Sequence, residues 1–154
     1  MPSREEILQS LGYPLDRLPL PGATYKTVVI EGSVAYVSGC LPNDGGRNLV
    51  SIGKVPSVVS LEDAKKAAAL SAANILRLIQ QETGSLDRIS RILKLVGFVN
   101  SDTNFTDQSQ VINGASQLMI DVLGEAGWHA RSAVGVAQLP LGASVEVEAI
   151  VQLK

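Results

Sequence analysis

The fold of this chain is decided by residues 130–151, which read ARSAVGVAQLPLGASVEVEAIV. Two runs rich in valine and alanine flank a Pro-Leu-Gly turn, so the stretch predicts two strands joined as a hairpin. Strand side chains alternate between faces, which places Glu146 and Glu148 together on one face. The apolar residues between them share the other face: Val145, Val147, Ala149 and Val151.

Three charged residues interrupt this otherwise apolar stretch. Arg131 stands at the head of the first expected strand, and Glu146 and Glu148 lie on the second. A solvated strand face with a surface ion pair explains such charges, and spacing alone favours that interpretation. The alternative is a site that requires one guanidinium and a carboxylate.

The same stretch resembles the signature of the YjgF/RidA family, formerly called the L-PSP endoribonuclease family. That signature runs approximately Ala-Arg-Ser-x-Val-x-Val-Ala-x-Leu-Pro, then a short turn, then x-Glu-Ile/Val-Glu-Ala-Ile/Val. The matching positions fall in register without a gap: Ala130, Arg131, Ser132, Val134, Val136, Ala137, Leu139, Pro140, Glu146, Glu148 and Ala149. Agreement at so many fixed points favours the family's site over a surface ion pair.

A second landmark lies near the amino terminus. Residues 25–31 and 34–38 are rich in β-forming residues and are joined by Gly-Ser, which predicts a strand pair. The family resemblance extends here, because a tyrosine precedes a strand pair that ends in Ser-Gly-x-x-Pro. The matching residues are Tyr25, Ser38, Gly39 and Pro42. Glycine lets a backbone approach a ligand closely, and serine offers a hydroxyl donor.

The remaining elements follow from capping residues and periodicity. Ser60 and Asp63 predict the start of a long helix, and Gly84 predicts its end. Its apolar stripe consists of Leu61, Ala64, Ala68, Ala72, Ile75 and Ile79. The other expected elements are a helix over 3–11, a surface connector over 13–22, a helical turn over 85–89, a strand over 91–100 and a helix over 105–123.

Three residues in the second half of the chain need comment. Asn113 and Gly114 form an Asn-Gly pair inside an expected helix, where propensity is poor, so we expect a close contact or a functional side chain. Ala133 stands where many RidA proteins have cysteine, and His129 stands where the family signature has proline. A lone loop histidine is usually exposed and idle, and we expect that of His129.

Length and composition set the broad class. A chain of 154 residues is expected to form a single domain, here residues 1–154 with 1–22 as an N-terminal helix and connector extension. The hydrophobic fraction of 45% is high for a monomer, and surplus apolar surface often enters an oligomer interface. The net charge of −2 without a basic cluster makes nucleic acid an unexpected partner.

Location is also predicted from the sequence. Cys40 is the only cysteine, so no intrachain disulfide can form, which suits a reducing compartment. The start carries Glu5 and Glu6 where a signal peptide needs a basic and then apolar run. The most apolar long segment, 64–79, contains charged residues and cannot span a bilayer. We therefore expect a cytoplasmic protein with no membrane partner, and Cys40 as a buried filler.

The resemblance implies a fold class and an assembly. Family members have an α+β, chorismate-mutase-like fold, with a mixed β-sheet and two long helices on one face. Three subunits pack their sheets around a central axis, and small 2-imino or 2-keto carboxylates bind in pockets at the subunit interfaces. A homotrimer is therefore expected, since the uncovered sheet face needs a partner.

The resemblance also implies an activity. RidA proteins hydrolyse reactive enamines and imines to 2-keto acids and ammonia. Arg131 would hold the substrate carboxylate, and Glu146 would position or deprotonate a water. Tyr25, Ser38, Gly39, Asn113 and Ala133 would shape the pocket and bind substrate. No metal or organic cofactor is expected, because one His and one Cys do not make a usual zinc site.

Two alternatives to the deaminase stay open at this point. One is a non-catalytic trimer that binds 2-keto carboxylates as a regulator, which would need the arginine but no general base. The other is the endoribonuclease activity that gave the family its older name. RNA cleavage requires an acid–base pair and phosphate-binding cations, of which the sequence offers little.

Overall fold

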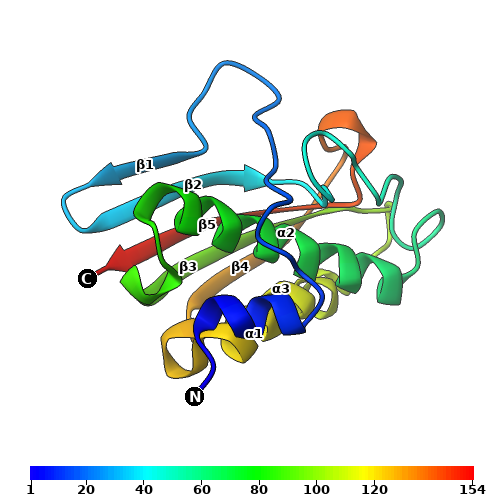
Figure 1. Ribbon diagram of the computed structural model, residues 1–154. Coiled ribbons are helices and arrows are strands. Elements are labelled where there is room, and N and C mark those ends of the chain that lie inside the picture. Colours follow the sequence, from blue (N-terminus) through cyan, green and yellow to red (C-terminus); the bar gives the residue numbers. More distant parts are fainter.

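Five strands form one mixed sheet in the order β1-β2-β5-β3-β4 in the computed structural model, which describes residues 1–154 (Figure 1). All neighbours are antiparallel except β3 and β4, which are parallel. The strands are β1 (Val28–Glu31), β2 (Val34–Cys40), β3 (Ile89–Asn100), β4 (Ala130–Val136) and β5 (Val145–Leu153).

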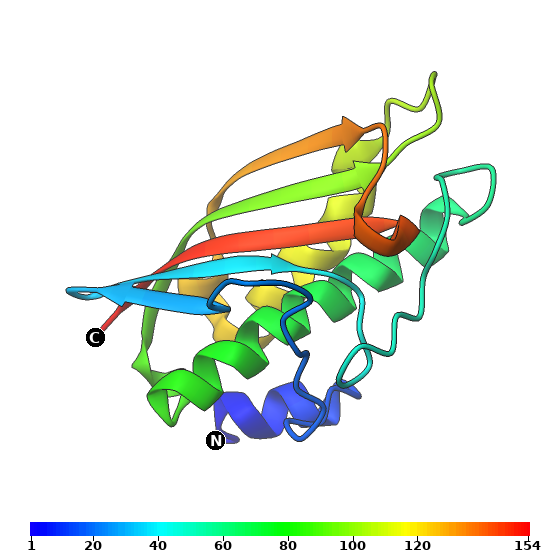
Figure 2. The same cartoon turned by 90° about the horizontal axis from the view of Figure 1, so that it is seen from above.

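The helices lie on one face of this sheet. Figure 2 shows α2 and α3 under the strands and α1 farther out, so the molecule has a sheet layer, a helix layer and a short outer helix. The helices are α1 (Arg4–Ser10), α2 (Leu61–Thr83) and α3 (Gln108–Leu123), with short 3-10 turns η1 (Leu86–Arg88), η2 (Gly124–Gly127) and η3 (Pro140–Gly142). The predicted fold class, α+β with a mixed sheet and two long helices on one face, is confirmed.

The expected hairpin over residues 130–151 is wrong, although both of its strands are present. β3 lies between β4 and β5, so these two strands never pair with each other. The chain from β3 through α3 to β4 is a parallel crossover, which requires a helix between its strands. The Pro-Leu-Gly segment then crosses the end of β3. There, the side-chain amide of Asn100 donates to the carbonyl of Ala143 at 3.1 Å.

The alternation predicted for β5 is confirmed. Its odd-numbered residues are buried under the helices and its even-numbered residues lie on the opposite face. The opposite face includes Glu146 and Glu148 together with Ile150 and Gln152. β5 therefore contributes buried residues to the core from one face and the two carboxylates from the other, because side chains alternate along a strand.

The long helix α2 begins and ends where the sequence indicates. The Ser60 hydroxyl accepts a hydrogen bond from the amide of Asp63, and Gly84 closes the helix in the left-handed conformation. Five of the six residues of the predicted stripe are fully buried: Ala64, Ala68, Ala72, Ile75 and Ile79. The small alanines bring α2 close to the sheet and to α3.

Gly114 lies where α3 packs closely against the backbone of α2. A Cβ built on this residue would lie 1.9 Å from the backbone oxygen of Lys65 in α2. Only glycine therefore fits here, which explains why Gly114 is present inside α3. Asn113, the other residue of the unusual Asn-Gly pair, is explained by its side chain, which accepts a hydrogen bond from Arg131.

Several element boundaries differ from the expected ones. β1 begins at Val28 rather than residue 25, and β3 begins at Ile89 rather than 91. α3 begins at Gln108 rather than 105, and residues 102–105 form a separate turn in which the amide of Phe105 donates to the carbonyl of Asp102 at 3.0 Å.

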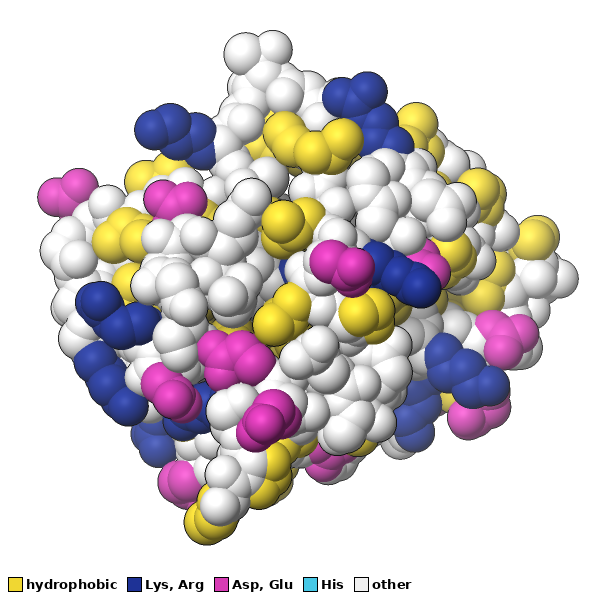
Figure 3. Space-filling model, viewed as in Figure 1, with side chains coloured by type: hydrophobic (Ala, Val, Ile, Leu, Met, Phe, Trp, Pro, Cys, Tyr) yellow, Lys and Arg dark blue, Asp and Glu magenta, His cyan; other side chains and the backbone are white.

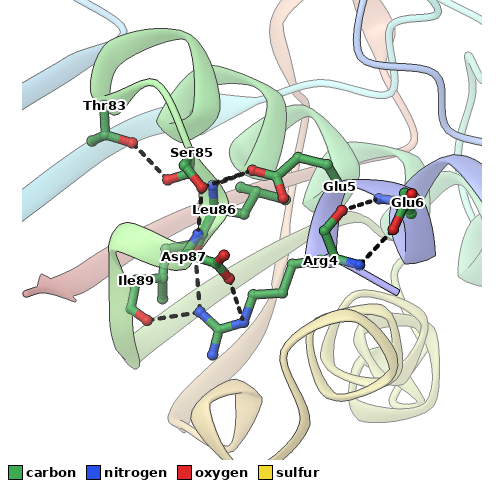
Figure 4. Close-up of polar contacts among 9 residues, drawn as sticks. Arg4, Glu5, Glu6, Thr83, Ser85, Leu86, Asp87 and Ile89 are labelled. Carbon is green, nitrogen blue, oxygen red and sulfur yellow. Dashed lines mark hydrogen bonds and ion pairs between the residues drawn. The ribbon is translucent and has the colours of Figure 1, made fainter. Parts of the chain in front are cut away.

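The amino-terminal helix is fastened to the body by polar contacts. The capping box of Ser3 and Glu6 is present, as predicted. Figure 4 shows Arg4 and Glu5 reaching from α1 to the turn after α2. The Arg4 guanidinium donates to the carbonyls of Leu86 and Ile89 at 3.0 and 2.8 Å, and the Glu5 carboxylate accepts from the amide of Leu86 at 2.6 Å.

The buried side chain of Arg77 connects the surface connector, residues 13–22, to the loop after β2 through hydrogen bonds. Arg77 in α2 is 1% exposed and donates to the carbonyl of Pro14 and to the side-chain oxygen of Asn74, both at 2.8 Å. Asn74 in turn donates to the carbonyls of Leu41 and Asn43, at 3.1 and 2.9 Å. This network fixes the loop that follows β2, and that loop lines the cavity described below.

The sheet face opposite the helices carries exposed apolar side chains. Val29, Tyr36 and Val134 on this face are 49%, 50% and 43% exposed. The side of the molecule that carries the helices is charged instead: Figure 3 shows acidic and basic side chains interspersed on it, without a basic patch.

None of the helices combines the length and the hydropathy that a bilayer crossing requires.

Candidate functional site

The site-forming residues predicted from the sequence fall into two groups in this chain. One group lines a cavity of about 520 Å³ at the end of β2 and β5, and it contains Tyr25, Ser38, Gly39 and Glu146. We call these four residues the cavity cluster. The rest of the wall comes mainly from the connector with the segment before β1, from η3 and from the loop after β2, and single residues come from β2, α2 and β5: Pro19, Leu20, Pro21, Gly22, Ala23, Thr27, Cys40, Leu41, Asn43, Arg47, Leu78, Pro140, Leu141 and Glu148.

An irregularity in β2 shapes this cavity. Val37 pairs with Ala149 and Cys40 pairs with Val147, so β2 holds one more residue than β5 between these pairs. The extra residue is a β-bulge at Ser38 and Gly39, a feature that turns side chains away from the regular pleat. The bulge brings the backbone of β2 against Glu146.

Glu146 is the acidic group of the cavity. Partial burial, and next the neighbouring charge of Glu148, raise the pKa of the Glu146 carboxyl above its ordinary value. Neither glutamate is in an ion pair, since the three salt bridges of the chain all lie elsewhere. A carboxylate without a fixed cation and with a raised pKa is suited to accept and return a proton.

Gly39 allows the Glu146 carboxylate to occupy this position. A Cβ on Gly39 would lie 2.0 Å from Oε1 of Glu146 and 2.8 Å from its Cδ. The carboxylate therefore rests directly over the glycine backbone. Position 39 of the Ser-Gly pair must therefore be glycine because any larger residue would displace the Glu146 carboxylate, whether or not a ligand also approaches the backbone there.

Replacing Gly39 by alanine should displace the Glu146 carboxylate. The obstructed atoms are the end of a flexible side chain, so we expect a small change in melting temperature but at least about a ten-fold loss of turnover. Gly22→Ala is the matched control, because a Cβ there meets nothing within 4 Å. Equal turnover in the two variants would show that the position of Glu146 does not matter.

The Ser38 hydroxyl is not a free donor, whereas Tyr25 lies on the cavity wall. The Ser38 hydroxyl donates to the carbonyl of Lys26 at 2.7 Å, so its remaining capacity is that of an acceptor. Tyr25 precedes β1, is 47% exposed and contributes to the cavity wall. Tyr25 belongs to the segment that joins the connector to β1, and Ser38, in β2, is bonded to the same segment through Lys26.

The second group surrounds Arg131 on the far edge strand. Nη1 of Arg131 donates to Oδ1 of Asn113 at 2.9 Å and to Oγ of Ser116 at 3.2 Å. Nη2 donates to the hydroxyl and the carbonyl of Ser109, at 2.6 and 3.3 Å. We call Ser109, Asn113, Ser116, His129 and Arg131 the arginine cluster. All acceptors of the guanidinium are neutral, so no acid within the chain neutralises its charge.

The sequence missed Ser109 and Ser116. Both lie on α3 with Asn113, at spacings of four and three residues, so they form one row on the helix surface. The sequence shows this row, but it does not show that α3 packs beside β4, so the contact of the two serines with Arg131 could not be predicted. Ala133 follows Arg131 by two residues on the same strand face, pairs with Gly97 and packs partly against the core.

The cavity cluster and the arginine cluster face different sides of the sheet. Arg131 is paired with Leu95, whose side chain is buried under the helices, and its guanidinium contacts α3. Glu146 is paired with Phe98 and alternates with the buried valines of β5. Since β3 also separates the two strands, one chain does not bring Arg131 and Glu146 together.

The expectation that His129 is exposed and idle is wrong. Its side chain is half-buried, with Nε2 2.8 Å from Oγ of Ser116 and Nδ1 2.6 Å from the carbonyl of Gly127. Burial, and the charge of Arg131, lower the pKa of His129, while the bond to Gly127 acts in the opposite direction. The histidine is therefore neutral at pH 7 and belongs to the arginine cluster.

Cys40 is buried, as predicted, although it contributes to the cavity wall. The side chain is 4% exposed, and burial raises the pKa of its thiol to about 12. A thiol with this pKa is almost entirely protonated at neutral pH and is a poor nucleophile. No group of three or more His, Cys, Asp or Glu side chains is placed to hold a metal ion.

The fold and these two clusters define a protein of the L-PSP class. The family model described as Endoribonuclease L-PSP matches residues 16–153, so the chain belongs to this family, also called YjgF/RidA. Protein TCP17 of Trypanosoma cruzi is 45% identical over 148 residues, which are 95% of this chain and 91% of TCP17.

Solved structures agree with the assignment. Atu1372 of Agrobacterium tumefaciens, of unknown function, is 45% identical with a TM-score of 0.90, and the match covers 98% of this chain and 92% of Atu1372. A Shewanella oneidensis MR-1 protein is 26% identical with a TM-score of 0.93, covering 99% and 100%. TdcF of E. coli, solved with bound serine, is 25% identical with a TM-score of 0.65, covering 90% and 95%.

Proposed function

We propose that this protein hydrolyses reactive 2-imino acids, and their enamine tautomers, to 2-keto acids and ammonia. The observation that carries the proposal is the presence of an unpaired carboxylate with a raised pKa, Glu146, in a cavity, together with an unneutralised guanidinium, Arg131. A planar carboxylate accepts two parallel hydrogen bonds from a guanidinium: here one comes from Nε of Arg131, which has no partner within the chain, and one from Nη2, whose bond to the Ser109 hydroxyl the carboxylate would replace. The serine bound to TdcF is a small amino carboxylate of comparable size.

The chemistry of the proposal needs only water. Glu146 takes a proton from a water molecule while the water oxygen adds to the imine carbon, and the electron pair of the C=N bond moves to nitrogen. The Glu146 carboxyl returns that proton to the nitrogen, which gives a neutral carbinolamine. Glu146 then takes the hydroxyl proton and delivers it to the nitrogen as the C–N bond breaks, so that ammonia leaves, the C=O bond of the keto acid forms, and Glu146 is again a carboxylate.

Because Arg131 and Glu146 lie apart in one chain, the proposal requires an assembly. We infer a homotrimer in which the arginine cluster of one subunit faces the cavity cluster of the next. The exposed apolar side chains on the open face of the sheet, such as Tyr36 and Val134, supply a surface for this contact. A cyclic arrangement of three identical contacts leaves no cluster without a partner.

Mixed trimers test this arrangement. If each site takes Arg131 from one subunit and Glu146 from another, then refolding an equal mixture of Arg131→Lys and Glu146→Gln chains should restore activity. Random assembly gives about one contact in four with both native residues. Sedimentation equilibrium should give three times the chain mass of 16.2 kDa. Restored activity is not expected if both residues act within one chain, and a monomer mass would also contradict the arrangement.

Arg131→Lys should weaken ligand binding while retaining the charge. Lysine lacks the planar fork, so at least one of two charge-assisted bonds to the carboxylate is lost, which corresponds to about a ten- to a hundred-fold weaker Kd. Calorimetric titration with pyruvate or 2-oxobutanoate measures the change. Arg91→Lys is the control, because Arg91 is exposed and contacts only Glu125. An unchanged Kd in Arg131→Lys would remove the clamp from the proposal.

The decisive assay generates imines in situ with an amino-acid-deaminating enzyme and follows the release of 2-keto acid. Faster release with this protein supports the proposal. Keto-acid binding without turnover would indicate a regulatory trimer instead. Cleavage of an RNA oligonucleotide, with no effect on imines, would indicate the activity in the family's older name.

A further inference from the structure

The hydrogens of the arginine cluster can be assigned from its partners. The carbonyl of Gly127 only accepts, so Nδ1 of His129 carries a hydrogen and donates to it. A neutral imidazole then presents a lone pair at Nε2, and the Ser116 hydroxyl donates to that atom. Both lone pairs of the Ser116 oxygen stay available, and one of them accepts from Nη1 of Arg131.

The direction of the Ser116 hydroxyl therefore depends on His129. A serine hydroxyl rotates to suit its surroundings, and within a helix it readily bonds a carbonyl of the preceding turn. His129 removes that freedom, because its Nε2 fixes the hydrogen and leaves an oxygen lone pair directed at the guanidinium. Asn113 and Ser116 then hold Nη1 from two sides, and the orientation of the fork is defined.

We propose that His129, acting through Ser116, is a positioning residue that orients the Arg131 guanidinium for a planar carboxylate. The inference rests on the proposed function in one respect, namely that a carboxylate is what the fork binds. The burial that keeps His129 neutral supports it, because a protonated Nε2 could not accept from Ser116. Proline, which the family signature has at this position, offers no such acceptor, so the relay is a feature of this chain.

Two amide substitutions test the role of Nε2. Glutamine at position 129 places an amide oxygen near the position of Nε2, where it accepts from Ser116. Asparagine retains only a donor near Nδ1 for Gly127. We expect His129→Asn and His129→Leu to weaken pyruvate binding by about five- to ten-fold, the effect of one lost neutral hydrogen bond, and His129→Gln to stay within about two-fold of wild type.

A second background separates positioning from general disruption. In Arg131→Lys the fork is absent, so His129→Asn should cause no further loss of pyruvate affinity, and the double-mutant cycle should show coupling between the two residues. An equal loss in both backgrounds would overturn the proposal. So would a His129→Asn variant that binds pyruvate as wild type does, or a His129→Gln variant that is no better than His129→Asn.

A measurement without ligand keeps this inference distinct from the proposed function. Rotation of the Arg131 guanidinium about its Cζ–Nε bond, followed by NMR, should be slow in wild type and His129→Gln and faster in His129→Asn. This result would support the relay even if wild-type protein bound no keto acid, an outcome that would reject only the proposed function. Equal rotation rates in all variants would overturn the relay even if pyruvate binds tightly.

Discussion

Glu146→Gln is expected to slow imine hydrolysis by about a hundred-fold or more while leaving 2-keto acid binding within about two-fold. Glutamine is nearly isosteric with glutamate and still fits over Gly39, but it does not accept a proton from water. The substrate carboxylate is held by Arg131, so affinity for pyruvate is not expected to change. Turnover and Kd are measured on the same preparation.

Glu148→Gln is the matched control for this substitution. Glu148 lies on the same face of β5 and also lines the cavity, and its charge helps to raise the pKa of Glu146. Removing that charge should change the acid limb of the pH profile more than the maximal rate. Equal turnover in wild type and Glu146→Gln would leave Arg131 as a binding residue without a general base.

The raised pKa of Glu146 also predicts how stability changes with pH. The folded protein protonates this carboxyl more readily than the unfolded chain does, so the contribution of Glu146 to stability is lost as pH rises through the folded-state pKa. Glutamine does not titrate. Glu146→Gln should therefore match wild type well below the ordinary glutamate pKa and become more stable than wild type toward neutral pH. Thermal unfolding at a series of pH values measures the difference.

Gly114→Ala should destabilise the protein by about 3 kcal/mol, or lower the melting temperature by about 6–12 °C. Two effects oppose each other at this position. Alanine has the higher helix propensity, by about 1 kcal/mol. Its methyl group would lie 1.9 Å from the backbone oxygen of Lys65, which cannot rotate away as a side chain can. The two helices would have to separate, and we expect that cost to dominate.

The sign of the change decides between these effects. A stabilised Gly114→Ala variant would mean that propensity dominates and that α2 and α3 accommodate a methyl group between them at little cost. If the helices do separate, Asn113 moves with α3 and its bond to Arg131 weakens. Pyruvate binding should then fall together with stability, although no atom of Gly114 takes part in binding.

Features encoded locally were predictable from the sequence. The caps of α1 and α2 depend on residues within a few positions, and Ser3, Ser60 and Gly84 were identified correctly. The alternation of β5 was also predictable, because a strand with one buried face repeats every two residues. The family resemblance located Tyr25, Ser38, Gly39 and Glu146 well enough that the structure gathers them in one cavity.

Features that depend on distant pairing were not predictable in the same way. Nothing in residues 130–151 shows that β3 inserts between β4 and β5, because strand order is decided by the crossover through α3. The partners of Arg131 on α3 follow from that same crossover. The interpretation of His129 failed for the related reason that its partner, Ser116, is thirteen residues away on another element.

The state of Cys40 determines how this protein can be labelled. The chain has a single cysteine, and its buried, protonated thiol should react very slowly with maleimides. The natural sequence is therefore already suited to site-directed spectroscopy, and one cysteine introduced on the surface would give a uniquely tagged sample. A fluorophore at position 134, on the open sheet face, would be shielded from a soluble quencher in an assembled trimer and accessible in a monomer. One at position 82, near the end of α2 on the helix-bearing side, is exposed and provides a reference in either state.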